Sequence, residues 1–168
     1  MNALLPHLFT FILPLFCANI VHMIIVRFRL LEFLAVPIAE KDLGKGKTWR
    51  GFIAMPLLTA IFSSLFNSQN MGHAFFVGFI LGLAYVLGEL PNSFIKRRIG
   101  IGSGESSRRF AFIQLIFDKL DSLLFLGVVY FLMIDIRISL LLLLILISFF
   151  IHLTFSYLLY VCGVKKSI

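Results

Sequence analysis

The sequence is short of charged residues. Only 14% of its 168 residues are charged, whereas a soluble domain carries about 25%. This shortage, together with 60% hydrophobic residues and a mean hydropathy of +1.03, excludes an ordinary soluble protein. It also excludes a disordered chain, which would be rich in charge and poor in apolar residues. We therefore expect an integral membrane protein that folds as a single domain over residues 1–168, with no separate soluble catalytic domain.

Cysteine is also scarce, and the two cysteines, Cys17 and Cys162, lie in separate apolar runs. They form no CxxC pair, so the sequence indicates neither a disulfide framework nor a thiolate metal site. It has no His/Cys zinc pattern and no Ser-His-Asp arrangement. The N-terminus lacks a basic stretch and a small-residue cleavage site, so we expect a membrane helix there and not a cleaved signal.

Long apolar segments make up most of the chain. A helix needs about 20 apolar residues to cross the hydrocarbon core of a bilayer. The segments that approach this length are residues 4–26, 52–66, 74–90, 110–133 and 138–161. The predicted fold class is therefore an all-α, polytopic membrane protein with five transmembrane helices.

The basic residues are concentrated in alternate loops. The chain has 15 Lys and Arg against 8 Asp and Glu, a net charge of +7. Most of them lie in the first loop, the third loop and the tail: Arg27, Arg29, Lys41, Lys45, Lys47, Arg50, Lys96–Arg98, Arg108, Arg109, Lys165 and Lys166. The positive-inside rule predicts that these segments face the cytoplasm and that the N-terminus lies outside. We expect this charge to contact headgroups or phosphates, not nucleic acid.

The predicted fourth span contains the sequence Asp118-Lys119-Leu120-Asp121, with apolar residues on both sides. Each such charge costs about 2.5–3.5 kcal/mol to place in a membrane, so a functional role is the default interpretation. The i, i+3 spacing puts both carboxylates on one face of a helix. Asp118 and Asp121 are therefore candidate catalytic residues and Mg²⁺ ligands, because Mg²⁺ binds one or two carboxylates together with substrate phosphates. The alternative is a structural cluster in which Lys119 neutralises one aspartate, or a helix start with its charges in water.

The first cytoplasmic loop contains a glycine-rich basic segment, Gly44–Gly51. Glycines let backbone N–H groups approach an anion, and Lys and Arg supply charge. It is not a Walker motif, because Lys41 stands where that motif needs its first glycine. Gly46, Lys47, Thr48 and Arg50 are predicted to bind substrate phosphates. The alternative is a basic loop that only sets topology and contacts anionic lipid.

A further polar segment follows the third span, at Glu89–Arg98. Glu89 lies near the membrane boundary, and Asn92 and Ser93 are predicted to cap a new helix after Pro91. Ser93, Lys96 and Arg97 fall within one helical turn, so we expect them to converge on one phosphate. Glu89 and Lys96 are predicted to be catalytic, and the predicted substrate-binding residues are Asn92, Ser93, Arg97 and Arg98.

Other polar and small residues within the spans have simpler interpretations. Asn19, His22 and His152 are isolated, which favours interhelical hydrogen bonds over ligand binding. Gly78 and Gly82 form a GxxxG motif typical of close helix packing, either within one chain or between two chains of a homodimer.

Together these segments resemble a known enzyme family. Ser93–Arg97 matches the opening of the phosphatidate cytidylyltransferase signature, and Asp118–Asp121 is similar to its closing Asp-Arg-x-Asp, although the middle of that signature is absent. The chain more closely resembles the small five-span CDP-archaeol synthase family, which pairs a Gly-Lys-Thr-Trp-Arg-Gly loop, here Gly46–Gly51, with the other two motifs. The resemblance implies Mg²⁺-dependent transfer from CTP to a lipid phosphate of archaetidic or phosphatidic acid type. Since the positive-inside rule puts all three motifs on the cytoplasmic side, we expect the active site on the cytoplasmic face of the cell membrane.

Other functions fit the sequence less well. A CDP-alcohol phosphotransferase or a lipid phosphatase would need motifs that this sequence lacks. A non-enzymatic membrane protein that binds anionic lipid or assists assembly stays open as an alternative. It explains the basic loops but leaves the aspartate pair without a role.

Overall fold

The computed structural model describes residues 4–102 and 111–161, apart from the side chains at positions 111–115, 117, 119, 159 and 160. Phe110, Arg108, Arg109, Cys162, Lys165, Lys166 and the Lys119 side chain therefore lie outside the description. The long helices are α2 (Leu13–Arg27), α4 (Trp49–Phe66), α5 (Met71–Arg98), α6 (Ala111–Met133) and α7 (Ile138–Val161). The short elements are α1 (Leu4–His7), the π-helical η1 (Leu8–Ile12), η2 (Glu32–Leu34), α3 (Glu40–Leu43) and η3 (Ser68–Asn70).

The all-α membrane fold is confirmed. Helical segments Leu4–Arg27, Trp49–Phe66, Ser68–Arg98 and Ile138–Leu158 are long and apolar enough to cross a membrane. Helix α6 contributes a shorter apolar stretch, Leu120–Met133. Four of the five predicted spans thus meet the length and composition of a membrane helix among the described residues; the span predicted over residues 110–133 and the orientation stay predictions.

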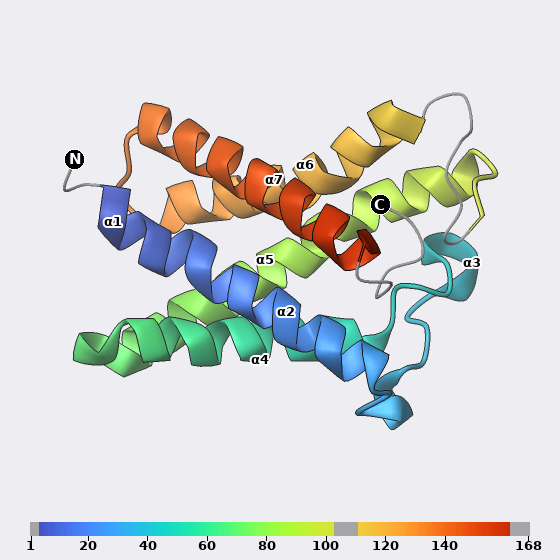
Figure 1. Cartoon of the computed structure of the whole chain (residues 1–168), viewed down its shortest axis with the longest axis horizontal. Coiled ribbons are helices and arrows are strands. Elements are labelled where there is room, and N and C mark those ends of the chain that lie inside the picture. Colours follow the sequence, from blue (N-terminus) through green and yellow to red (C-terminus); the bar gives the residue numbers. More distant parts are fainter. Residues whose placement is uncertain (1–3, 103–110, 162–168) are drawn as a thin grey trace.

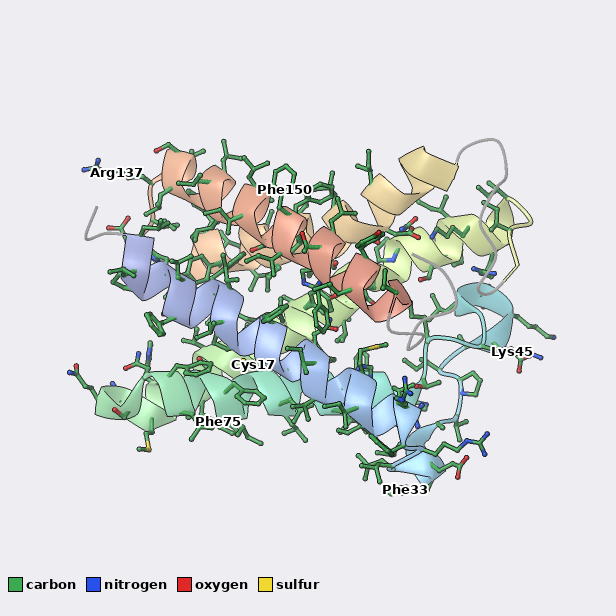
Figure 2. The ribbon with its side chains drawn as sticks, viewed as in Figure 1. Cys17, Phe33, Lys45, Phe75, Arg137 and Phe150 are labelled. Atoms are coloured by element: carbon green, nitrogen blue, oxygen red, sulfur yellow. The ribbon has the colours of Figure 1, made fainter. Side chains whose placement is uncertain are left out.

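The helices place the loops at two opposite ends of the molecule (Figure 1). Helix α5 runs diagonally from α4 at one end towards α3 at the other. We call the latter the loop end, because it holds residues 28–48 and the C-terminal part of α5. Lys45 lies at the loop end and Arg137 at the opposite end (Figure 2). The sides of the bundle are apolar, as at Phe75 and Phe150, which are exposed and suited to contact with lipid.

The GxxxG motif packs inside the chain, against α4. A Cβ atom on Gly78 would lie 2.5 Å from the Cβ of Ser63. A Cβ on Gly82 would lie 2.6 Å from the Cα of Pro56. Both glycines are therefore covered by a helix of the same chain. The homodimer stays a prediction, and the GxxxG motif is not available to form its interface.

Helix α5 is longer than the sequence predicts. The third span was expected to end at Leu90, with Asn92 and Ser93 capping a new helix, and that prediction is wrong because the helix continues through Pro91 to Arg98. Proline removes the backbone hydrogen bond that residue 91 would donate, and one turn of helix tolerates this loss; further along, the Ser93 hydroxyl donates a 2.9 Å bond to the carbonyl oxygen of Glu89. Contacts from Asn92 and Lys96 to α6 further hold the extension in place.

Candidate functional site

The first loop folds back on itself and presents its glycine-rich segment to α5. Its two arms are joined by backbone bonds from Ile38 N to Lys47 O, 2.9 Å, and from Trp49 N to Val36 O, 3.0 Å. Between the arms, Gly44 directly follows α3, and its φ of +83° favours glycine. This geometry directs Lys47 towards α5, where its ammonium group forms an ion pair with Glu89.

A cavity of about 430 Å³ lies between this loop and helices α2, α4, α5 and α7. Five predicted site residues line it: Gly46, Lys47, Thr48, Arg50 and Glu89. The structure therefore brings the glycine-rich loop and the polar end of the third span to one cavity. Asn92, Ser93, Lys96, Arg97, Arg98, Asp118 and Asp121 are not among the residues that line it.

Tyr85 lines the same cavity, and sequence analysis gave it no role. It lies one helical turn before Glu89 on α5, and its hydroxyl is in hydrogen-bonding contact with the Glu89 carboxylate. Asn19 donates to the Tyr85 hydroxyl at 3.4 Å, and His152 stacks on the Tyr85 ring with centroids 5.8 Å apart. The interhelical contacts expected of Asn19 and His152 are thus present, and they meet at Tyr85. The i, i+4 spacing of a tyrosine and a glutamate was the available signal.

Two polar nitrogen atoms of the cavity lining have no hydrogen-bond partner among the described residues. The Nε2 atom of His22 and the Nε atom of Arg50 are both buried and have no hydrogen-bond partner there. Arg50 uses another nitrogen, Nη1, to donate a 3.3 Å bond to the Leu30 carbonyl. Buried polar atoms without partners are costly, and the Nε–H of Arg50 can only donate, so the cavity is suited to a polar, negatively charged ligand.

The aspartate pair lies on α6, beside the C-terminal part of α5. Asn92 donates a 2.7 Å bond from Nδ2 to Oδ1 of Asp118, and Lys96 forms an ion pair with the same carboxylate. Asp121 accepts a 2.6 Å bond from the Ser122 backbone N–H. The alternative in which Lys119 neutralises an aspartate concerns a side chain outside the description, but Lys96 already balances Asp118.

Gly88 allows the two helices to approach at this point. A Cβ atom on Gly88 would lie 2.8 Å from the Cα of Ser122 and 2.9 Å from the Cβ of Phe125. Because Glu89 follows Gly88 and Asp121 precedes Ser122, the contact draws the carboxylates of the two helices together. Glu89 and Lys47 both lie close enough for their charges to act on Asp121. The aspartate pair therefore adjoins the Lys47–Glu89 pair.

The sequence predicted that Ser93, Lys96 and Arg97 converge on one phosphate. In the structure their side chains face different partners. Lys96 pairs with Asp118, whereas Arg97 lines a different cavity. Arg98 lies 3.9 Å from Asp42 of α3 and stacks over Phe94. The Ser93 hydroxyl is bonded to a backbone carbonyl. Successive helical residues point about 100° apart, which is why neighbouring cations on α5 face different partners.

The carboxylates suit Mg²⁺ only if the ligand completes the site. Within residues 4–102 and 111–161, no group of three His, Cys, Asp or Glu side chains is placed to hold a metal ion. Mg²⁺, however, binds through one or two carboxylates plus substrate phosphates and water. Asp118 and Asp121 provide that donor set on one helical face, so the residues fit Mg²⁺ supplied together with a phosphate-bearing substrate.

Comparisons with known proteins point in one direction. A family model described as CarS-like, CDP-archaeol synthase, matches residues 1–168. A protein named CDP-archaeol synthase from Archaeoglobus fulgidus is 36% identical over 90 residues, which cover 46% of this chain and 49% of that protein. The chain thus spans about half the length of the curated relative that it matches. No solved structure matches the chain.

Proposed function

The chain belongs to the CDP-archaeol synthase family, and we propose that it transfers the cytidylyl group of CTP to the phosphate of a membrane lipid, releasing diphosphate. The observation that carries the proposal is the close approach of α5 and α6 at Gly88 and Ser122, which places the aspartate pair beside Glu89, whose partner Lys47 lines a polar cavity. Carboxylates for a metal and cations for phosphates are what nucleotidyl transfer requires.

The reaction is a substitution at the α-phosphorus of CTP. An oxygen of the lipid phosphate forms the new P–O bond, and the bond between the α-phosphorus and the bridging oxygen breaks to release diphosphate. The attacking phosphate is already an anion at neutral pH, so no strong general base is needed. Negative charge grows on the leaving diphosphate, and we assign its stabilisation to Lys47, Arg50 and Lys96.

Asp118 and Asp121 would hold Mg²⁺, which supplies positive charge that neutralises and orients the phosphates when it is bound. Lys96 forms an ion pair with Asp118, and in this proposal its ammonium group would turn from that carboxylate to a phosphate of the bound substrate. Glu89 serves as a further metal ligand or as the group that orients Lys47. Thr48 and Asn92 position the phosphates and the carboxylate, respectively.

We propose an ether-linked lipid phosphate of archaetidic acid type as the acceptor, because the relative's name refers to archaeol. The active site would face the cytoplasm, since the described basic residues Arg27, Arg29, Lys41, Lys45, Lys47, Arg50 and Lys96–Arg98 gather at the loop end. CTP would then enter from the cytoplasm and the lipid from the bilayer, between helices whose outer faces are apolar.

The test uses purified protein in detergent with Mg²⁺ and labelled CTP. Archaetidic acid and phosphatidic acid are offered in separate reactions, and label entering the lipid phase is measured. We expect label with archaetidic acid, at a higher rate than with phosphatidic acid. Folded protein that does not bind CTP and does not transfer label would contradict the proposal and favour the non-enzymatic alternative.

A further inference from the structure

Arg97 has donor capacity that no neighbour in the described structure uses. Its Nε and Nη1 atoms are shielded from water and have no hydrogen-bond partner among the described residues. A guanidinium group stays charged at any physiological pH and presents its donors in a planar fork. Leaving such donors unpaired is costly, so an acceptor from outside the described residues would stabilise this part of the protein.

Arg97 faces a cavity that is different from the one proposed for the nucleotide. This cavity has a volume of about 490 Å³ and lies between α3 and the C-terminal end of α5. It is lined by Glu40, Lys41, Gly44, Lys45, Arg97, Gly100, Ile101 and Gly102. Lys45 lines both cavities, so the two adjoin, but Asp118 and Asp121 line neither.

The lining is strongly cationic. It has three basic side chains against one carboxylate, and that carboxylate, on Glu40, is 3.6 Å from the ammonium group of Lys45. Lys41 and Arg97 are therefore not balanced by an acidic residue of the lining. The rest of the wall is formed by three glycines and Ile101, and the glycines leave room for a tetrahedral anion. An excess of Lys and Arg around an open volume is typical of a phosphate site.

The fold holds both walls of the cavity in place. Helix α3 packs against α5, and the two lie side by side at the loop end (Figure 1). Arg98 connects them, because its guanidinium reaches Asp42 of α3 at 3.9 Å while stacking over Phe94 of α5. Arg98 thus supports the cavity from outside, and the adjacent Arg97 faces its interior.

We propose that this cavity is a second phosphate-binding site, with Arg97 as its central ligand and Lys41 and Lys45 at its rim. It takes a phosphate or diphosphate group, either free in solution or on the headgroup of an anionic lipid. The site itself does not depend on the proposed function. If that function holds, the second site adjoins the nucleotide cavity at Lys45.

The first test measures binding of inorganic diphosphate to the purified protein without Mg²⁺ or CTP. We expect saturable binding that Arg97→Gln weakens by about tenfold or more, since a forked, charged ligand is lost. Lys41→Gln, an exposed rim variant with little risk to folding, should weaken binding by about threefold. Arg137→Gln removes a charge at the opposite end of the molecule and should bind like the wild type.

A second variant separates the two cavities. Lys47→Gln removes a cation from the first cavity only, so it should retain diphosphate binding that depends on Arg97. A lipid source is tested by mass spectrometry of protein released from nanodiscs of phosphatidylglycerol and phosphatidylcholine. Phosphatidylglycerol retained by the wild type and lost in Arg97→Gln would support the site and identify a headgroup as its ligand.

Two results would overturn the proposal. One is that Arg97→Gln binds diphosphate and retains phosphatidylglycerol as well as the wild type does. The other is that Lys47→Gln loses as much as Arg97→Gln, because the anion would then occupy the first cavity. Neither result bears on whether label from CTP enters lipid, so a failure here is distinguishable from a failure of the proposed function.

Discussion

Asn92 on α5 donates a 2.7 Å hydrogen bond to Oδ1 of Asp118 on α6. This contact joins two motifs that are 26 residues apart in the sequence. It exists because α5 continues past Pro91, which carries Asn92 and Lys96 to the aspartate pair. The C-terminal end of α5 therefore orients one carboxylate of the proposed metal site through Asn92.

The aspartate pair supplies the first prediction. Asp118→Asn or Asp121→Asn keeps the size of the side chain but removes a charge that Mg²⁺ requires. We expect either variant to abolish transfer of label from CTP while remaining folded, as judged by size-exclusion chromatography and thermal unfolding. Substantial turnover by either variant would rule out the metal assignment.

Asn92→Ala tests whether Asp118 must be oriented. Groups that hydrogen-bond to metal ligands typically contribute about 10–100-fold to metal affinity or activity. We expect the variant to need more Mg²⁺ for half-maximal activity, with a smaller change in the maximal rate at saturating Mg²⁺. An unchanged Mg²⁺ dependence would mean that Asn92 does not act through Asp118. Ser68→Ala, in η3 between α4 and α5, is the control and should leave the Mg²⁺ dependence unchanged.

Tyr85→Phe tests the support of Glu89 within the nucleotide cavity. The substitution removes the hydroxyl that contacts Glu89 and Asn19 but keeps the ring that stacks on His152. We expect a reduced kcat/KM for CTP with little change in thermal stability. Asn19→Ala should have a smaller effect in the same direction, since its contact with Glu89 is indirect, through the Tyr85 hydroxyl. A clear loss of thermal stability together with the lower kcat/KM would instead indicate a purely structural role for the hydroxyl.

Gly88→Ala tests the close approach of α5 and α6. Its added methyl group would overlap the Ser122 backbone and the Phe125 side chain, and such overpacking typically costs about 1–3 kcal/mol. We expect a lower free energy of unfolding and a loss of activity, because Glu89 and Asp121 move apart.

Gly72→Ala on the same helix is the matched control for that substitution. A Cβ atom there would meet nothing within 4 Å, and alanine favours helix over glycine. Its stability should be equal to or slightly above that of the wild type, and its activity should be unchanged. A loss in both variants would show that the effect is not specific to the helix crossing.

Much of this arrangement could be predicted from the sequence. The apolar runs predicted the helices, and the glycine-rich loop and Glu89 were both expected at the site. Each depends on local composition or on charge in an apolar setting, which a single sequence displays directly. The structure places Gly46, Lys47, Thr48, Arg50 and Glu89 around one cavity, as that interpretation requires.

The remainder depends on contacts between distant residues. Pro91 favours a helix break by local rules, and only the packing of Asn92 and Lys96 on α6 explains why the helix continues. The separation of Arg97 from Lys96 likewise follows from which helix lies on each side of α5. Tyr85 was missed because an aromatic residue in a span is ordinarily a packing residue, and its hydroxyl partners come from other helices or a later turn.

The measurement that tests the central claim most directly follows two labels of CTP in parallel reactions with archaetidic acid and Mg²⁺. With the label on the α-phosphate, we predict that radioactivity enters the lipid phase in the wild type and does not in Asp121→Asn. With the label on the γ-phosphate, we predict that all radioactivity stays in water as diphosphate. Appearance of the γ-label in lipid, or of neither label in lipid with folded, nucleotide-bound protein, would contradict cytidylyl transfer.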